Sequence, residues 1–307
     1  MKNGYLHKKS TVEKLFYFFM LCLIGKLFFS GLSYYASNWI FNCDLNTIII
    51  GKNLERNTLR AYKFAAVLDQ IGTFFIPTLL FCYFFSKSFL DYLTLNSLNK
   101  SLVLIVPASF VVMYFSSILM LEFNQKIDFS FLGDEILASF TENQKLLEKI
   151  HYSFIGISYS NLAGCIFVMA VVPAICEELV FRGILQQLLS KWFNNIHLGI
   201  VFSAVVFAVL HFQFLNLLAL LFIGIFLGYI VSITNNLWTS IILHFLYNLI
   251  SVFTIFLEKK SGFNLQHFTE KTPNYIFSIV GLVSLLCLIA LLRKNNLFSS
   301  TKEKYLQ

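Results

Sequence analysis

The sequence contains few charged residues. Asp, Glu, Lys and Arg occupy only 13% of its 307 positions, whereas 57% of the positions are hydrophobic and 17% are aromatic. Soluble globular domains carry charge at about a quarter of their positions. Together with a mean hydropathy of +0.72, this scarcity of charge excludes an ordinary soluble domain and indicates a protein embedded in a membrane.

Proline is also scarce, with 4 residues against 36 phenylalanines. Long apolar runs are typical of membrane-spanning helices, whereas the strands of a membrane barrel span about 10 residues and alternate apolar with polar positions. The sequence therefore predicts an all-α fold, a polytopic helical bundle in a lipid bilayer.

The six cysteines show no disulfide framework, because five lie inside apolar runs and only Cys43 lies in a connecting loop. We interpret them as small packing residues. No cysteine stands near the last residue, so we do not expect the chain itself to be prenylated.

The net charge of +7 does not indicate a nucleic-acid partner. The basic residues lie at both ends and in short loops beside apolar runs, which is the distribution that orients a membrane protein. Lysines and arginines at both ends predict that both termini are cytoplasmic. We separately expect that the membrane is a bacterial inner membrane.

Segments with enough apolar residues to cross a bilayer, about 20 each, predict eight spans. They cover about residues 14–40, 61–86, 102–122, 155–180, 198–214, 217–234, 238–257 and 274–292. An even number of spans agrees with two cytoplasmic termini, and the acidic loop at residues 121–150 then lies outside.

The loop at residues 41–60 is also expected outside, although it carries Lys52, Arg56 and Arg60. We predict that part of this loop lies in the membrane interface. Lys26 and Asp69 lie in the first two spans and could pair, but an interfacial position of Asp69 is the preferred interpretation.

The fourth span contains charged residues that a bilayer disfavours by at least about 2.5–3.5 kcal/mol each. They are Glu177, Glu178 and Arg182. Glu178 and Arg182 are four residues apart, share one helix face and can pair, whereas Glu177 points about 100° away. Glu177 then faces another helix or water, as a general base does; alternatively, both acids reach the cytoplasmic interface at a helix end.

Only two of the six histidines, His211 and His244, lie inside apolar spans. Phe207 precedes His211 by one helical turn and Asn248 follows His244 by one turn, so each pair shares a helix face. Each site alone is typical of hydrogen-bonded helix packing. Together with Glu177 they suffice for amide hydrolysis by water, because they offer a base and donors for the developing oxyanion.

In this order the motifs Glu-Glu-x-x-x-Arg, Phe-x-x-x-His and His-x-x-x-Asn resemble those of the CPBP family, the CAAX-processing and bacteriocin-processing intramembrane proteases of the Abi type. The resemblance covers residues 173–248. It implies a core of about eight helices, with Glu177 and His211 activating water and His244 and Asn248 binding the oxyanion. It also implies supporting roles for Glu178, Arg182 and Phe207.

The resemblance implies an intramembrane endopeptidase whose substrate is a membrane-associated peptide or protein. Eukaryotic family members remove the last three residues of prenylated CAAX proteins, and bacterial relatives are associated with peptide maturation, self-immunity and signalling. On this basis we divide the chain into an N-terminal membrane region at 1–150 with three spans and a charged outer loop, a catalytic core at 151–292 and a basic tail at 293–307. The sequence predicts no oligomeric state.

Zinc is an alternative to direct activation of water by glutamate. Glu177, His211 and His244 resemble a His₂Glu zinc site, and family members are often described as metalloproteases. A separate carboxylate base would then be needed, yet Glu178 is placed to pair with Arg182. We therefore favour a mechanism without a required cofactor.

Other functions remain as alternatives. Cys176 adjoins Glu177 but points about 100° away on a helix, so we interpret it as a packing residue and not as a nucleophile. A non-catalytic scaffold or immunity protein that binds a peptide or sensor is the rival outside enzymology. A transporter is weaker, because the sequence shows neither broken helices nor repeated halves.

Overall fold

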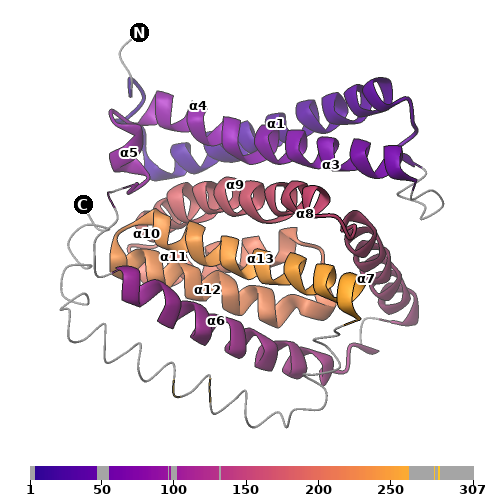
Figure 1. The fold of residues 1–307 in the computed structure, drawn as a ribbon. Coiled ribbons are helices and arrows are strands. Elements are labelled where there is room, and N and C mark those ends of the chain that lie inside the picture. Colours follow the sequence, from indigo (N-terminus) through magenta and orange to yellow (C-terminus); the bar gives the residue numbers. More distant parts are fainter. Residues whose placement is uncertain are drawn as a thin grey trace. The chain divides into compact units, whose positions relative to one another are not determined.

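The computed structural model describes residues 4–46, 55–95, 97, 102–130, 133–262, 280 and 283. Within these ranges the chain forms helices joined by short turns and contains no β-strand (Figure 1). The prediction of an all-α helical bundle is confirmed.

Six helices in the described ranges are long and apolar enough to cross a membrane. They are Thr11–Phe41, Arg56–Phe85, Ile105–Gln125, Tyr159–Trp192, Phe214–Thr234 and Leu237–Ser261. The chain is thus an integral membrane protein in composition and fold.

Two of the eight expected spans are not among these six. The expected span at 198–214 corresponds to the apolar helix α11 (Ile196–Leu210), whose 15 residues rise about 22 Å, less than the roughly 30 Å of a hydrocarbon core. The span expected at 274–292 lies outside the described residues, apart from positions 280 and 283. The count of eight and the cytoplasmic termini stay predictions.

The chain divides into two compact units that interleave along the sequence. Unit 1 comprises Met1–Lys87, Glu142–Val180 and Asn248–Asn264, and unit 2 comprises Ser88–Thr141, Phe181–Tyr247 and Leu265–Gln307. The division at residues 150 and 292 that the sequence suggests stays a prediction.

In unit 1, the long helix α1 (Thr11–Phe41) lies beside a second span made of three consecutive helices (Figure 1). These are α3 (Arg56–Gln70), the π-helical turn η1 (Ile71–Phe75) and α4 (Ile76–Phe85). A Cβ atom on Gly25 would lie 2.4 Å from the carbonyl oxygen of Gly72. These glycines therefore let the two spans approach closely, as small residues do between membrane helices.

Lys26 and Asp69 form an ion pair between the same two spans. The Lys26 Nζ lies 2.6 Å from Asp69 Oδ2, and the Ser30 hydroxyl donates to Asp69 Oδ1 at 2.5 Å. The pairing that the sequence leaves open is therefore present, and an interfacial position of Asp69 stays a prediction. The pairing explains how two opposite charges are tolerated in apolar helices.

The rest of unit 1 is formed by α8 (Tyr159–Ile166), the π-helical turn η3 (Phe167–Val171), α9 (Val172–Val180) and parts of α7 (Asp134–Phe154) and α13 (Leu237–Ser261). Their buried apolar core comprises Ile150, Phe154, Ile155, Leu162, Cys165, Val252 and Phe256. This core fixes the start of the span that carries the two glutamates.

The acidic outer loop expected at residues 121–150 is largely helical. The helix α6 (Leu102–Gln125) extends into it and α7 begins at Asp134. Asp134 and Glu135 occupy the first turn of α7, where their negative charges interact favourably with the helix dipole. Because α7 is amphipathic, its apolar residues do not form the uninterrupted run that predicts a membrane span.

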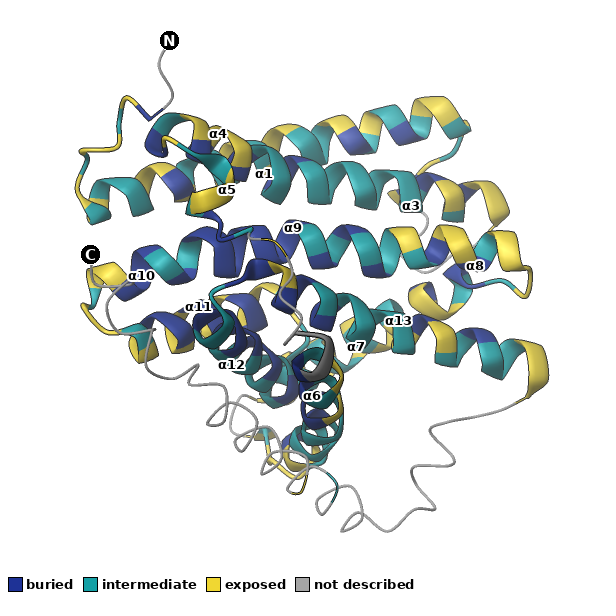
Figure 2. Ribbon diagram, turned by 60° about the vertical axis from the view of Figure 1, so that its left-hand side comes forward, coloured by how far each residue is buried: buried dark blue, intermediate teal, exposed yellow. Residues whose placement is uncertain are grey.

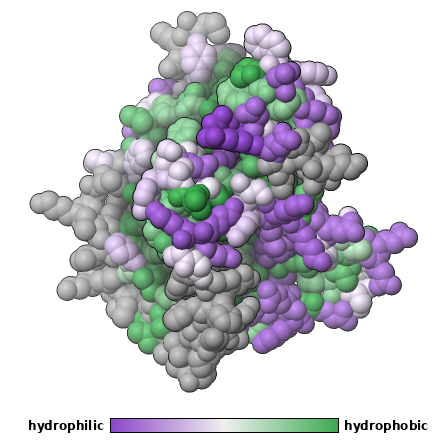
Figure 3. Space-filling model, turned by 45° about the vertical axis from the view of Figure 1, so that its right-hand side comes forward, coloured by the Kyte–Doolittle hydropathy of each residue, from purple (hydrophilic) through white to green (hydrophobic). Residues whose placement is uncertain are grey.

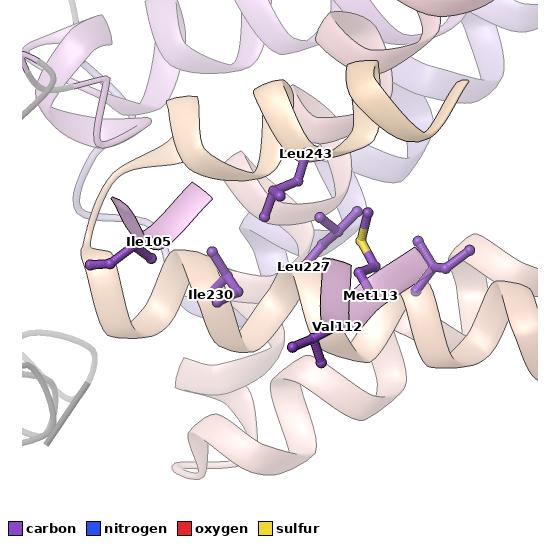
Figure 4. Packing of buried hydrophobic residues seen from close by; sticks show 7 residues of the cluster. Ile105, Val112, Met113, Leu227, Ile230 and Leu243 are labelled. Atoms are coloured by element: carbon purple, nitrogen blue, oxygen red, sulfur yellow. The ribbon is translucent and has the colours of Figure 1, made fainter. Parts of the chain in front are cut away.

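Unit 2 includes the short helix α5 (Phe89–Tyr92), α6, the π-helical turn η4 (Phe181–Leu185), α10 (Gln186–Trp192), α11, the 3₁₀ turn η5 (Phe214–Asn216) and α12 (Leu217–Thr234). The first part of α13 completes it. Side chains from α6, α12 and α13 interlock in its apolar core (Figure 4). The labelled members are Ile105, Val112, Met113, Leu227, Ile230 and Leu243.

The helix with the glutamates continues to Trp192 and does not end near residue 180 as expected. Polar residues in the last part of this helix are buried and hydrogen-bonded. Gln186 is 1% exposed, and its amide donates to the carbonyl oxygen of Gly228 at 3.2 Å and to the Ser232 hydroxyl at 3.1 Å. Helix packing thus satisfies these buried polar groups.

Candidate active site

Glu177 lies in unit 1 on α9, and only 7% of its surface is exposed. The C-terminal part of α9 is buried, and Glu178 is fully buried (Figure 2). The side-chain amide of Gln70 donates to Glu177 Oε1 at 3.1 Å. The predicted base is therefore a buried carboxylate that a neighbouring span holds by a hydrogen bond.

The sequence alone does not single out Gln70. It is the last residue of α3, and the π-helical turn η1 starts at the next residue. A single wide turn of this kind shifts the helix register and is frequent at functional sites. The signal that could have drawn attention to Gln70 is its position beside Asp69, a second polar residue inside an apolar span.

In unit 2, the ring of Phe207 on α11 brings several predicted residues together. Phe207 is 1% exposed. Its ring centroid lies 4.4 Å from that of His211 and 6.0 Å from that of His244, and 4.7 Å from Arg182 Cζ. Phe207 also meets Phe181 edge-on at 5.2 Å. The unit thus assembles Arg182 and both histidines of the motifs around one aromatic ring.

His211 follows the last residue of α11, and its ring is held by the helix end. Nδ1 lies 2.7 Å from the carbonyl oxygen of Phe207. A carbonyl only accepts hydrogen bonds, so Nδ1 carries the proton and Nε2 has a lone pair in the neutral ring. The next residue, Phe212, has φ of 52°, a strained backbone conformation for a bulky residue that often accompanies functional sites.

Arg182 is almost fully buried in unit 2, at 2% exposed. Its Nη2 donates to the carbonyl oxygen of Gly224 on α12 at 3.0 Å, and its guanidinium lies over the face of Phe207. A Cβ atom on Gly224 would lie 2.9 Å from Cβ of Ala204, so glycine permits this close packing of α11 and α12. The pairing of Arg182 with Glu178 stays a prediction.

His244 and Asn248 both lie on α13, one helical turn apart. His244 is 5% exposed and belongs to unit 2, whereas the half-buried Asn248 belongs to unit 1. Unit 1 therefore holds Glu177, Glu178 and Asn248, and unit 2 holds the remaining motif residues. The catalytic roles of these residues stay predictions.

No group of three or more His, Cys, Asp or Glu residues arranged to hold a metal ion occurs in the described part of the chain. The orientation of His211 is compatible with zinc, because metal-binding histidines donate their second ring nitrogen to a carbonyl or carboxylate. It is equally compatible with a histidine that accepts a proton. The hydrogen bond of His211 thus fits both predicted mechanisms.

The five cysteines that the structure describes are free thiols, which agrees with the absence of a disulfide framework in the sequence. Cys176 is 3% exposed. Its burial is consistent with the predicted packing role.

Helices long and apolar enough to cross a membrane, with buried carboxylates, an arginine and a histidine among their residues, define the class of an integral membrane protein. Residues 159–250 match the family model described as type II CAAX prenyl endopeptidase Rce1-like. This segment is thus similar to the Rce1-like domain of CAAX-type intramembrane proteases, which confirms the resemblance seen in the sequence. All residues of the three motifs lie inside it.

No curated protein and no solved structure matches the chain.

Proposed function

We propose that this protein is an intramembrane endopeptidase that hydrolyses a peptide bond of a membrane-associated peptide or protein in a bacterial inner membrane. The substrate is a CAAX-type protein or a peptide of the bacteriocin or pheromone type. The observation that carries the proposal is the family match at residues 159–250, which contains all three motifs in order. The family implies a protease.

In the proposed reaction, Glu177 takes a proton from a water molecule, assisted by His211. The water oxygen attacks the carbonyl carbon of the substrate and gives a tetrahedral oxyanion, to which His244 and Asn248 donate hydrogen bonds. The bond between carbon and nitrogen then breaks, and the proton held by Glu177 passes to the leaving amine. The products are a carboxylic acid and an amine, and the acid then gives its proton to the amine or to solvent.

The contacts within each unit support these roles. Gln70 holds Oε1 of Glu177, which limits rotation of the carboxylate and preorganises it for proton transfer. The Phe207 carbonyl fixes the His211 ring, so that Nε2 is the nitrogen that can accept a proton. Arg182 acts indirectly, since it packs on the Phe207 ring.

Zinc is the alternative agent for activating water. If the ion is present, Glu177, His211 and His244 would hold it, and it would polarise the attacking water and the substrate carbonyl. We favour direct activation by Glu177, because the sequence offers Glu178 as a partner of Arg182 and no further carboxylate base in the motifs.

Chelation separates the two mechanisms. We expect the purified protein to keep its peptidase activity after exhaustive removal of divalent metals, because no proposed step requires a metal. Product formation would be measured before and after chelation. Complete loss of activity that added zinc restores would refute direct activation.

The function itself is tested by comparing membrane and secreted peptides from wild-type cells with those from Glu177→Ala and His211→Ala cells. We expect one peptide or protein to accumulate uncut in both variants and to appear cut in the wild type. Glu148→Ala is the control, because Glu148 is an exposed carboxylate on α7. Identical peptides and an unchanged phenotype in both variants would favour a scaffold.

A further inference from the structure

Unit 1 contains a cavity of about 600 Å³ at the end where α3 and α8 both begin (Figure 1). Its wall includes three basic side chains, Arg56, Arg60 and Lys63, and no acidic one. These positions follow one another at intervals of four and three residues on α3, so they share one helix face. The cavity is therefore strongly positive and is independent of the motifs.

The opposite wall is the turn that leads into α8. Ser158, Ser160 and Asn161 line it, and the Ser158 hydroxyl accepts from the backbone N–H of Asn161 at 3.3 Å. A helix that starts against a cavity directs its first N–H groups and the positive end of its dipole toward it. The start of α8 therefore gives the cavity neutral hydrogen-bond donors and a positive potential in addition to its three cationic side chains.

The three cations differ in their present contacts. Lys63 Nζ donates to the carbonyl oxygen of Phe154 at 2.7 Å and lies 3.1 Å from Cys165 Sγ. Those bonds fix Lys63 at the floor of the cavity. Arg56 and Arg60 are exposed, and within the described ranges neither forms an ion pair. Their guanidinium groups are the ones that can fold over a ligand.

The depth of the cavity in the membrane indicates the source of an anion. Arg56 and Tyr159 are the first residues of two helices that are long and apolar enough to cross a membrane, which indicates that the cavity lies near the level where lipid headgroups begin. Ile157 on its wall and the neighbouring Tyr159 are 65% and 70% exposed, and exposed apolar and aromatic residues are typical of that level. Figure 3 shows one face of the molecule, on which many hydrophilic residues lie next to hydrophobic ones.

We propose that this cavity binds a phosphate-bearing anion, with Arg56 and Arg60 as its principal ligands and Lys63 as a third contact. Guanidinium groups bind phosphate oxygens through paired hydrogen bonds. The membrane depth favours the headgroup of an anionic phospholipid over free phosphate. The proposal also explains why a loop expected outside the cell carries Arg56 and Arg60.

The test counts lipids bound to the purified full-length protein. The protein is reconstituted in phosphatidylcholine containing phosphatidylglycerol, and the retained lipids are counted by native mass spectrometry. We expect Arg56→Gln/Arg60→Gln to retain at least about tenfold less phosphatidylglycerol, because each lost guanidinium removes charge-assisted bonds to phosphate. Retention of phosphatidylcholine should not change.

The matched control is Lys8→Gln/Lys87→Gln, which removes two exposed charges of unit 1 outside the cavity. In a second arm, binding of labelled inorganic phosphate is measured without anionic lipid. Phosphate binding that depends on the two arginines, without lipid retention, would support the site with free phosphate as its ligand. Equal retention of both ligands by the arginine variant and the wild type, or an equal loss in the control, would overturn the proposal. The readout does not depend on proteolysis.

Discussion

Gln70 is the residue of the second span whose side chain reaches the proposed base. Its amide donates to Glu177 Oε1 at 3.1 Å, and it also lines a cavity of about 390 Å³ together with Asp69 and Ser30. A hydrogen bond to a buried carboxylate fixes the orientation of the group. Gln70 is thus a positioning residue in the proposed reaction.

Gln70→Leu should lower the rate of cleavage by roughly tenfold or more, since a hydrogen bond to a charged group contributes about 1.5–3 kcal/mol. The protein should still fold, because leucine suits an apolar span. Initial rates of product formation on a common substrate would be measured.

Gln144→Leu is the matched control. It also removes an amide donor from a glutamate, because Gln144 Nε2 donates to Glu148 at 3.0 Å on α7, but it leaves Glu177 untouched. An unchanged rate in Gln70→Leu, or an equal loss in Gln144→Leu, would remove Gln70 from the mechanism.

The sequence predicts single residues well when their chemistry conflicts with a bilayer. Glu177, Arg182 and His244 are all buried, as the cost of unpaired polar groups in lipid requires. The sequence predicts poorly which polar side chains form hydrogen bonds with one another. The bonds of Lys26 to Asp69 and of Gln70 to Glu177 join residues 43 and 107 positions apart, and only the packing of helices determines which polar groups meet.

At the scale of helices, long apolar runs predicted most spans to within a few residues, because a bilayer imposes length and composition together. The prediction of helices is wrong where a helix is not a continuous apolar run of the length that a bilayer requires. The sequence predicts a loop where the amphipathic α7 forms, and it predicts that the fourth span ends before α10, whose polar residues Gln186 and Ser190 are buried. The π-helical turns η1 and η4 leave no recognisable pattern in the sequence.

The contact between α10 and α11 depends on Gly199. A Cβ atom at this position would lie 2.6 Å from the backbone nitrogen of Ser190 and 2.0 Å from its hydroxyl oxygen. We expect Gly199→Ala to destabilise the protein by about 1–3 kcal/mol through overpacking, because the backbone of Ser190 cannot move aside easily. Thermal unfolding in detergent should show a lower midpoint.

Gly31→Ala is the control for this experiment, because an added Cβ on Gly31 meets no atom within 4 Å. Alanine favours a helix over glycine by about 1 kcal/mol, so this variant should be at least as stable as the wild type. Equal midpoints for Gly199→Ala and Gly31→Ala would contradict the packing described for α10 and α11.

At the scale of the whole molecule, the distribution of basic residues predicts cytoplasmic termini and an outer location for α7. Lys8 and Glu142 are exposed, so each can be replaced by cysteine. In a Cys43→Ser background, a membrane-impermeant maleimide applied to intact cells should label Glu142→Cys but not Lys8→Cys, and permeabilised cells should label both. Labelling of Lys8→Cys in intact cells would reverse the predicted orientation.

The central claim is that the protein cleaves a membrane substrate with Glu177 as its base. The most direct measurement adds purified protein to membranes isolated from Glu177→Ala cells, where the uncut substrate accumulates, and identifies new peptide ends by mass spectrometry. We predict that the wild type and Glu148→Ala generate the same new ends and that Glu177→Ala generates none. New ends that appear equally with Glu177→Ala would contradict the account.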